Sequence, residues 1–229
     1  MRHMNDARAL TEEIKKRAIA YGADLVGIVS TETIDAVPRH FVGWDYQAYT
    51  KKSTEYMEGS RSVIVLGYQA WDDIHEIQIR RRGAWEYPVY QRMRLYARRL
   101  LRHIQGLGYE GMVYPELMSQ KRMAQLAGLG SFGKNSLILN PRYGPWIRLQ
   151  SILTDVELAP DEPFEEDLCG DCEACIRACP VGALTLYTVD AERCSGHLNQ
   201  MPPFTENSTL MCTQCQRACP HGREERGLL

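Results

Sequence analysis

Apolar residues in the first part of the chain recur at helical spacing in some segments and form short continuous runs in others. A helix is predicted over residues 6–21, where apolar side chains recur every four residues and Gly22 follows as a stop signal. The apolar stretch Leu25–Val29 predicts a strand, and residues 30–60 are predicted to be irregular because neither period is present. The residues that carry the helical spacing are Leu10, Ile14 and Ala18.

The same patterns continue to residue 153. Val63–Leu66 is a short apolar run typical of a buried strand, and Val89–Gln105 has one apolar side, which predicts a helix. A shorter helix is predicted over Ser119–Ala127. Leu137–Leu139 and Trp146–Leu153 are predicted to be two strands joined by a turn.

Helices and strands mix here without a regular strand–helix–strand alternation, which favours an α+β fold over a doubly wound sheet. The segment 157–167 is acidic, contains two prolines and has no period, so it is predicted to be a linker. We therefore expect an α+β domain over residues 1–160, as the candidate substrate- and cofactor-binding part, and a cysteine domain over residues 161–229.

Composition and charge exclude several classes of protein. The chain has 229 residues, of which 44% are hydrophobic and 24% charged, and this is ordinary globular usage. Its net charge of −2 does not suggest a general affinity for nucleic acid or anionic membrane. No apolar run approaches the roughly 18 residues of a membrane span, and no export signal follows Met1–Arg8. A cytoplasmic protein without membrane contact is expected.

The distribution of cysteines suggests metal binding. All eight fall between Cys169 and Cys219. Secreted proteins stapled by disulfides are smaller and spread their cysteines along the chain, so this crowding indicates metal ligands.

The first four cysteines have the spacing of bacterial ferredoxins, Cys-x2-Cys-x2-Cys-x3-Cys-Pro. In that arrangement three thiolates bind one [4Fe–4S] cluster and the fourth binds the other cluster. A tight loop with two intervening residues lets successive sulfur atoms reach corners of one cluster. The four are Cys169, Cys172, Cys175 and Cys179, followed by Pro180.

The second group has Cys-x2-Cys-x3-Cys-Pro, with Cys194 alone upstream. If the last cysteine of each group binds the cluster of the other group, which we call the exchange rule, every cysteine is used once. The 18-residue separation between Cys194 and Cys212 implies an insertion, Ser195–Met211, that could face a partner or another cofactor. The rule assigns Cys169, Cys172, Cys175 and Cys219 to the first cluster, and Cys179, Cys194, Cys212 and Cys215 to the second.

Structural zinc is the alternative for these cysteines. Zinc sites use isolated Cys-x2-Cys pairs with four ligands per ion, and a run of four cysteines ending in Cys-Pro is poor zinc spacing. Two [4Fe–4S] clusters are therefore predicted. Their interleaved ligands hold them close together, so the domain is predicted to conduct electrons.

Three segments outside this domain, together with it, resemble epoxyqueuosine reductases, a family related to the reductive dehalogenases. They are Gly59–Gly67, Ala127–Ser136 with the sequence AGLGSFGKNS, and Leu137–Asp155. The resemblance implies a nitroreductase-like α+β domain that binds base-off cobalamin, to which the two clusters pass electrons. The cofactor then carries the chemistry and the protein positions it.

The resemblance also implies the residues that contact cobalamin. Glycines of the AGLG segment would let the backbone approach the corrin, where a Cβ would clash. Three polar residues after them would contact corrin amides or the nucleotide tail, and two apolar residues of the predicted strand pair would face the macrocycle. The eight are Gly128, Gly130, Gly133, Lys134, Asn135, Ser136, Ile138 and Leu149.

Two departures from the family bear on substrate. The queuosine enzymes carry an aspartate, as proton donor, where this chain has Tyr114; dehalogenases use a tyrosine, so Tyr114 and the nearby Glu116 are the candidate proton donors. Those enzymes also continue into a tail that contacts tRNA, whereas this sequence ends at Leu229, which weakens the expectation of tRNA.

Two other features have simpler alternatives. The glycines at 128, 130 and 133 match Gly-x-Gly-x-x-Gly, but the predicted helix precedes and the strand follows them, the reverse of a dinucleotide site. A basic stretch over residues 80–102 could meet RNA or the phosphate of a cobalamin tail, although a solvated helix face with salt bridges is the more common explanation.

Three functions follow from these observations. The first is a cobalamin-dependent reductase of a small molecule or modified nucleoside, with a ferredoxin or flavodoxin as electron donor. The second is a ferredoxin-like electron-transfer protein without cobalamin, which reduces or activates a partner such as a corrinoid protein. The third is a tRNA-modifying enzyme, whose complex with tRNA would be sensitive to salt.

Overall fold

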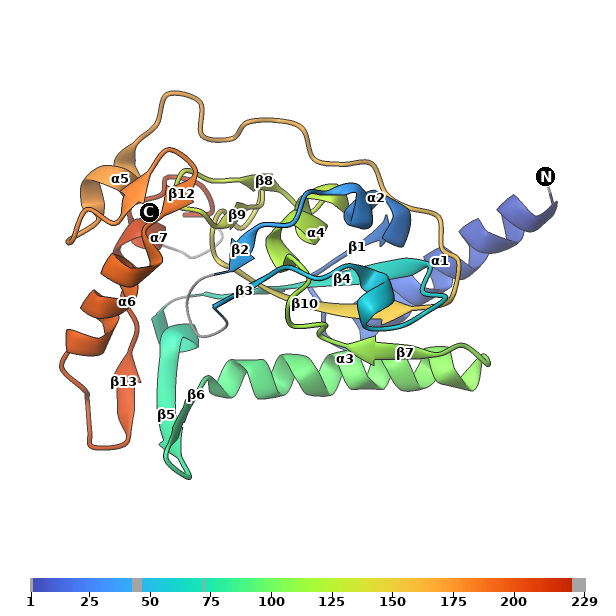
Figure 1. Cartoon of the computed structure of the whole chain (residues 1–229), viewed down its shortest axis with the longest axis horizontal. Coiled ribbons are helices and arrows are strands. Elements are labelled where there is room, and N and C mark those ends of the chain that lie inside the picture. The colour runs from blue at the N-terminus through green and yellow to red at the C-terminus, as the bar shows by residue number, and fades with distance from the viewer. Residues whose placement is uncertain (1, 43–46, 72, 224–229) are drawn as a thin grey trace.

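A computed structural model describes residues 2–42, 47–71 and 73–223. Its centre is a four-stranded antiparallel sheet with the strand order β1-β4-β10-β7 (Figure 1). The two inner strands are eight residues long and lie side by side over their whole length. The strands are β1 (Leu25–Ser30), β4 (Ser62–Gln69), β7 (Gly111–Val113) and β10 (Ile147–Thr154).

Helices cover both faces of this sheet, because both faces of its inner strands are apolar. On β4, Ile64 packs with helices α1 (Arg2–Ala20) and α3 (Pro88–Gly106), while Val63 packs on the opposite face with α2 (Thr31–Ala36) and α4 (Gln120–Leu126). The two apolar clusters form a three-layer helix–sheet–helix arrangement. Buried side chains of α3 in the first cluster are Met93, Ala97, Leu100 and Ile104.

Short elements fill the connections of this first part. Two of them are β-ribbons, formed by β2 (Phe41–Val42) with β3 (Ala48–Tyr49) and by β8 (Ser131–Phe132) with β9 (Ile138–Leu139). Two others are 3₁₀ turns, η1 (Ser53–Glu55) and η2 (Asp73–Glu76).

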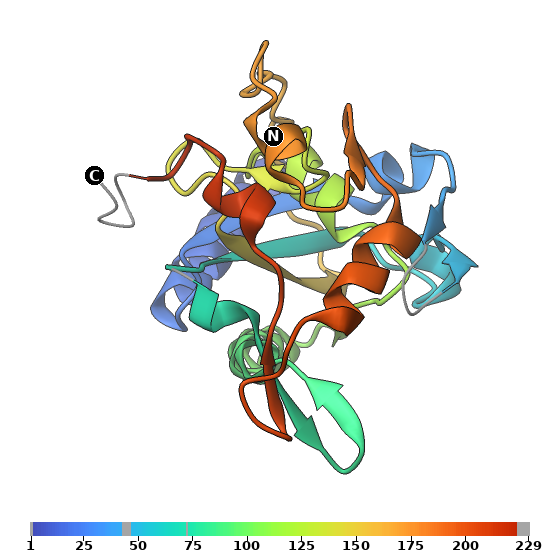
Figure 2. The same cartoon turned by 90° about the vertical axis from the view of Figure 1, so that its left-hand side faces the viewer.

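The cysteine region, residues 168–223, lies at one end of the sheet (Figures 1 and 2). A strand of this region pairs with a hairpin of the first part, giving a three-stranded sheet in the order β13-β5-β6. This shared sheet ties the region to the first part. Its elements are β5 (Ile77–Arg81), β6 (Ala84–Glu86), α5 (Ala174–Ala178), β11 (Leu184–Thr185), β12 (Thr188–Val189), α6 (Ala191–Gln200), β13 (Ser208–Leu210) and α7 (Gln214–Arg217).

The segment 157–167, predicted to be a linker, has no regular structure, and it is fixed to the first part. Asp161 accepts hydrogen bonds from Lys15 Nζ at 2.5 Å and from the Ile28 backbone N–H at 2.8 Å. The Phe164 N–H donates to the Gln125 carbonyl at 2.9 Å. These contacts hold the connection against α1, the strand β1 and α4.

The α+β prediction is confirmed, and two local predictions are wrong. Residues 30–60 include the helix α2, whose N-cap Ser30 accepts a hydrogen bond from the Thr33 N–H. The predicted strands 137–139 and 146–153 exist as β9 and β10 but do not pair with each other. β10 pairs with β4 along its whole length and with β7 over Ile152–Thr154, whereas β9 pairs with β8.

Within the described ranges, no helix is both long and apolar enough to cross a membrane.

Candidate metal centres

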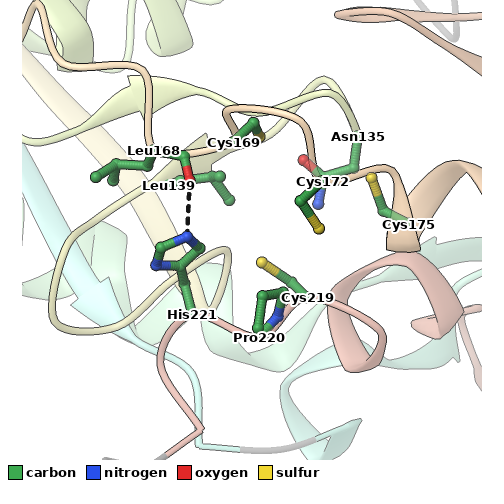
Figure 3. Close-up of a pocket in the computed structure, with 9 residues that line it drawn as sticks. All are labelled: Asn135, Leu139, Leu168, Cys169, Cys172, Cys175, Cys219, Pro220 and His221. Carbon is green, nitrogen blue, oxygen red and sulfur yellow. Dashed lines mark hydrogen bonds between the residues drawn. The ribbon is translucent and has the colours of Figure 1, made fainter.

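Four cysteines from two distant stretches surround one cavity. Cys169 and Cys172 lie on the loop before α5, and Cys175 lies on α5; the fourth, Cys219, follows α7. Figure 3 shows the four side chains around the same space, with His221 Nε2 donating a hydrogen bond to the Leu168 carbonyl oxygen at 2.8 Å on one side. The cavity therefore collects the four thiols that the exchange rule assigns to the first cluster.

The surroundings of these thiols disfavour the deprotonated, negatively charged form unless a cation is nearby. Burial, together with the nearby thiols of Cys169, Cys175 and Cys172, raises the pKa of Cys219 to about 11, since thiolates repel one another. Burial also raises the pKa of Cys175. A positively charged metal centre removes this cost, because coordinated thiols are deprotonated. The donor set thus fits an iron–sulfur cluster.

The other four cysteines form a second group. Burial is the main cause that raises the pKa of Cys215 to about 12, and repulsion from neighbouring thiols contributes to that value; these are Cys212, Cys194, Cys175 and Cys179. Burial likewise raises the pKa of Cys194, helped by Cys179 and Cys212. Cys179 caps the end of α5, Cys194 is on α6 and Cys215 is on α7. Three short helices thus direct their thiols to one place.

All eight cysteines are free thiols. Among the described residues, no group of three or more histidine, cysteine or carboxylate side chains is placed to hold a single metal ion. The case against structural zinc therefore rests on the spacing of the cysteines in the sequence, which is poor for zinc.

The AGLGSFGKNS segment contacts the first cysteine group directly. The Lys134 backbone N–H donates to Cys169 Sγ at 3.4 Å, and its buried ammonium donates to the Gly170 carbonyl at 2.8 Å. Asn135 is 5% exposed and lines the cavity (Figure 3). These two residues are therefore part of the junction between the first part and the cysteine region.

The three glycines of this segment are required by the chain itself. A Cβ at Gly130 would lie 2.1 Å from the Leu139 carbonyl oxygen, and one at Gly128 would lie 2.8 Å from the Glu162 carbonyl oxygen. At Gly133 it would lie 2.6 Å from the Asn135 side-chain oxygen. The close approaches that need glycine here are to the protein's own atoms, and they explain the segment without a corrin.

The remaining residues of the predicted cobalamin set are also engaged within the chain. Ile138 is 3% exposed, and it packs in the same apolar cluster as the half-buried Leu149. The Ser136 carbonyl accepts a hydrogen bond from Lys121 Nζ at 2.6 Å. As a set, these eight residues do not fit a cobalamin cradle, because their groups already contact one another, the cysteine region or the core.

The candidate proton donors lie on a different segment, between β7 and α4. Tyr114 is half-buried, and its φ of 56° is in the left-handed region that non-glycine residues rarely adopt. Its N–H donates to the Ser151 carbonyl of β10 at 2.8 Å, which fixes this conformation. Glu116 is exposed. The structure thus holds Tyr114 in place and leaves Glu116 in solvent.

A half-buried lysine near the second cysteine group was not predicted. Lys121, in the first turn of α4, has its pKa lowered by burial, while the nearby Cys215 acts in the opposite direction. Lys121 belongs to no sequence motif, and a polar residue in an amphipathic helix gives no signal of burial. A backbone donor was also missed: the Ala183 N–H donates to Cys179 Sγ at 3.2 Å.

A polar seam joins η2 to the cysteine region. Asp73 accepts a hydrogen bond from Thr213 Oγ1 at 2.7 Å and forms an ion pair with Arg217 of α7. Glu76 pairs with Arg148 of β10, and both side chains are about one tenth exposed. Burial lowers the pKa of Arg148 to about 10, so this arginine depends on its partner.

Comparison with known proteins agrees with this geometry. Residues 168–223 match a family model described as a 4Fe-4S dicluster domain. An epoxyqueuosine reductase from Leadbetterella byssophila is 28% identical over 83% of this chain and 70% of its own length. The chain resembles epoxyqueuosine reductases in both sequence and fold. The relatives that match it over more than four fifths of its residues are longer, and it spans 57% to 70% of their length.

Two solved structures show the extent of the likeness to epoxyqueuosine reductases and their relatives. One is an epoxyqueuosine reductase with an epoxyqueuosine-modified tRNA-Tyr stem loop, at 23% identity and a TM-score of 0.71 over 94% of this chain and 66% of that one. The other is a reductive dehalogenase whose structure suggests a B12-dependent mechanism, at 21% identity and a TM-score of 0.69 over 97% and 34%. At these identities the structures share the fold.

Proposed function

We propose that this protein is an oxidoreductase that passes electrons through two [4Fe–4S] clusters. Two groups of four thiols, each drawn from both ends of the cysteine region, carry this proposal. The first cluster is bound by Cys169, Cys172, Cys175 and Cys219. The second is bound by Cys179, Cys194, Cys212 and Cys215.

Backbone donors stabilise the charge on these clusters. Reduction adds negative charge to a cluster, and hydrogen bonds to its sulfur atoms favour the reduced state. The Lys134 N–H serves Cys169 and the Ala183 N–H serves Cys179. The positive charge of Lys121 acts in the same direction on the second cluster, near Cys215. A soluble ferredoxin or flavodoxin is the proposed electron donor.

Tyr114 is the proposed proton donor for a substrate that accepts these electrons. A non-glycine residue in a left-handed conformation costs about 1–3 kcal/mol and persists where its surroundings fix it, most often at functional sites. Its phenol has a proton to give at neutral pH. Glu116, which is exposed, is the weaker candidate.

Cobalamin is the electron acceptor that the resemblance implies, and when bound it would supply the reductive chemistry. The residues named for it do not fit a cradle, so we derive no step through a corrin. This observation favours the second candidate function, in which the clusters deliver electrons to a corrinoid held by a partner protein. A modified nucleoside in tRNA is the substrate class that the epoxyqueuosine reductases suggest.

A cofactor count separates these two functions. Protein is produced without oxygen in cells supplied with cobalamin, and iron, sulfide and corrin absorbance are measured together. About eight irons with one corrin support a reductase that holds its own cofactor, whereas about eight irons without corrin, even after direct addition, support the electron-transfer function. An iron content well below eight, with sulfide to match, contradicts both.

A further inference from the structure

An exposed apolar turn is linked to the first cysteine group. The hairpin of β11 and β12 turns through Leu186 and Tyr187, whose side chains are 57% and 41% exposed. The Tyr187 hydroxyl donates a hydrogen bond to one oxygen of Asp167 at 3.0 Å, and the other oxygen accepts from the Cys169 backbone N–H at 3.0 Å. One carboxylate therefore joins the exposed turn to a proposed ligand of the first cluster.

This turn carries residues that such turns do not favour. Tyr187 has a φ of 60°, in the left-handed region where glycine or asparagine is usual in a two-residue hairpin turn. Instead, two large side chains stand in solvent at the end of the molecule away from α1 (Figure 1). Exposed apolar groups with a polar rim mark contact sites. Complexes of redox proteins have small interfaces, below about 1,200 Å², which suit a surface of this size.

Negative charge is concentrated around the same cysteine group. Residues 161–190 contain eight carboxylates and one arginine, for a net charge of −7, while the whole chain carries −2. Five exposed carboxylates flank or separate the first two cysteines, and none of the five forms an ion pair within the described ranges. We call these five, together with Leu186 and Tyr187, the acidic surface. The five are Glu165, Glu166, Asp167, Asp171 and Glu173.

The first cluster site is reached from this side. Cys169 and Cys172 are partly exposed on the loop that carries Asp171, whereas Cys175 and Cys219, which line the same cavity, are each only 8% exposed. A partner that approaches the first cluster from solvent therefore meets the loop of Cys169 and Cys172, and with it the acidic surface.

We propose that the acidic surface is the docking site of the electron donor, and that this donor is a small redox protein with a positively charged surface around its redox centre. Leu186 and Tyr187 form the apolar centre of the contact. The carboxylates steer the donor to it, because opposite charges raise the rate of encounter. A ferredoxin or flavodoxin with an acidic surface fits less well, since like charges would face each other. This inference rests on the proposed electron transfer and names the chemistry of its partner.

The test runs the transfer in reverse, because docking does not depend on its direction. The cluster-loaded protein, reduced with dithionite, is mixed in stopped flow with a basic c-type cytochrome whose haem edge is ringed by lysines. One electron passes from a reduced cluster to each ferric haem, which becomes ferrous. The second-order rate constant should fall about tenfold or more from low to physiological salt. The same cytochrome with succinylated lysines, which is negative, should react more slowly at low salt and faster as salt is added.

Two variants separate the charges from the apolar centre. Glu165→Gln/Glu166→Gln/Glu173→Gln should slow the reaction with the basic cytochrome about tenfold at low salt and flatten its salt dependence. Leu186→Ala, at an exposed position, should slow the reaction about two- to fivefold at every salt concentration and leave the salt dependence unchanged.

A matched control removes three exposed carboxylates of the first part, in Glu12→Gln/Glu32→Gln/Glu58→Gln. It should change the rate less than about twofold. Equal losses in the two triple variants, or an unchanged rate in the first, would overturn the proposal. So would self-association at low salt, followed by sedimentation, that the first triple variant abolishes, because a second copy of the chain would then occupy the surface.

Iron content and electron paramagnetic resonance of the reduced clusters are measured on every variant. About eight irons and two reducible clusters, with rates that do not depend on these carboxylates, would refute the docking site and leave the proposed electron transfer standing. Protein without reducible clusters would refute both.

Discussion

The backbone N–H of Lys134 donates a hydrogen bond to the sulfur of Cys169, 3.4 Å away. A loop of the first part thus serves a proposed cluster ligand of the cysteine region. The side chain of the same lysine reaches Gly170. The AGLGSFGKNS segment is therefore the place where the first part positions and stabilises the first cluster.

Removing the Lys134 ammonium should loosen this junction. Lys134→Met leaves the Gly170 carbonyl without its charged donor and should lower the free energy of unfolding by about 1.5–3 kcal/mol. Anaerobic denaturant unfolding measures the change. Lys16→Met, at an exposed site on α1, should stay within about 0.5 kcal/mol of the wild type. Equal effects of the two changes would contradict a structural role for Lys134.

The charge of Lys121 should set the potential of one cluster more than the other. Lys121→Met removes a half-buried positive charge near Cys215, so the second cluster should become harder to reduce, by several tens of millivolts. Lys121→Arg should restore most of the shift. Redox titration followed by electron paramagnetic resonance reports both clusters. A shift of similar size in the first cluster would speak against this assignment.

Gly130 and Gly196 should respond to alanine with opposite signs. At Gly130 the new Cβ would lie 2.1 Å from the Leu139 carbonyl oxygen. Only a shift of the backbone can relieve this clash, so the free energy of unfolding should fall by about 1–3 kcal/mol or more. At Gly196, inside α6, nothing lies within 4 Å, and alanine should stabilise by about 0.5–1 kcal/mol. Unfolding free energies compare the two. A tolerated Gly130→Ala would mean that the segment leaves room for another group.

The ion pair of Glu76 and Arg148 should be costly to break. Arg148→Gln leaves a buried carboxylate without its partner and should cost about 3–5 kcal/mol. Arg193→Gln, which breaks an exposed pair with Asp190, should cost less than about 1 kcal/mol. Denaturant unfolding distinguishes the two, and similar losses would show that the seam does not depend on this pair.

Tyr114 should be needed for turnover but not for the clusters. Tyr114→Phe removes the phenolic proton and should lower reduction of an epoxyqueuosine-containing RNA stem-loop by about 10²–10⁴-fold, with iron content unchanged. Glu116→Gln is the matched change on the same loop and should have little effect, since Glu116 is exposed. Full activity of Tyr114→Phe would exclude it as the proton donor.

The sequence was most informative where the signal is local. Helices α1, α3 and α4 follow from apolar spacing, and the cysteine spacing points to two clusters because three ligands of the first cluster lie in one short run of sequence. Long-range partners leave no such signal. Asp161 holds Lys15 across 146 positions, and neither residue stands in a motif.

The insertion between Cys194 and Cys212 shows the same limit of local signals. Its strand β13 pairs with β5 of the first part, which the sequence did not reveal, while its expected role in facing a partner or a cofactor stays a prediction. On β5 only Ile77 and Ile79 alternate with polar residues, a pattern too short to separate a strand from a loop. The glycine-rich segment was likewise linked to cobalamin by resemblance, and the close approaches that require its glycines are seen only in three dimensions.

The exchange of ligands between the two cysteine groups is the central claim, and paired substitutions test it most directly. Cys169→Ala/Cys219→Ala removes two ligands of one cluster, and the protein should retain about four irons. Cys215→Ala/Cys219→Ala removes one ligand from each cluster and should leave almost none. If the first double variant instead lost nearly all its iron and the second kept about four, each cysteine group would bind its own cluster and the assignment would be wrong.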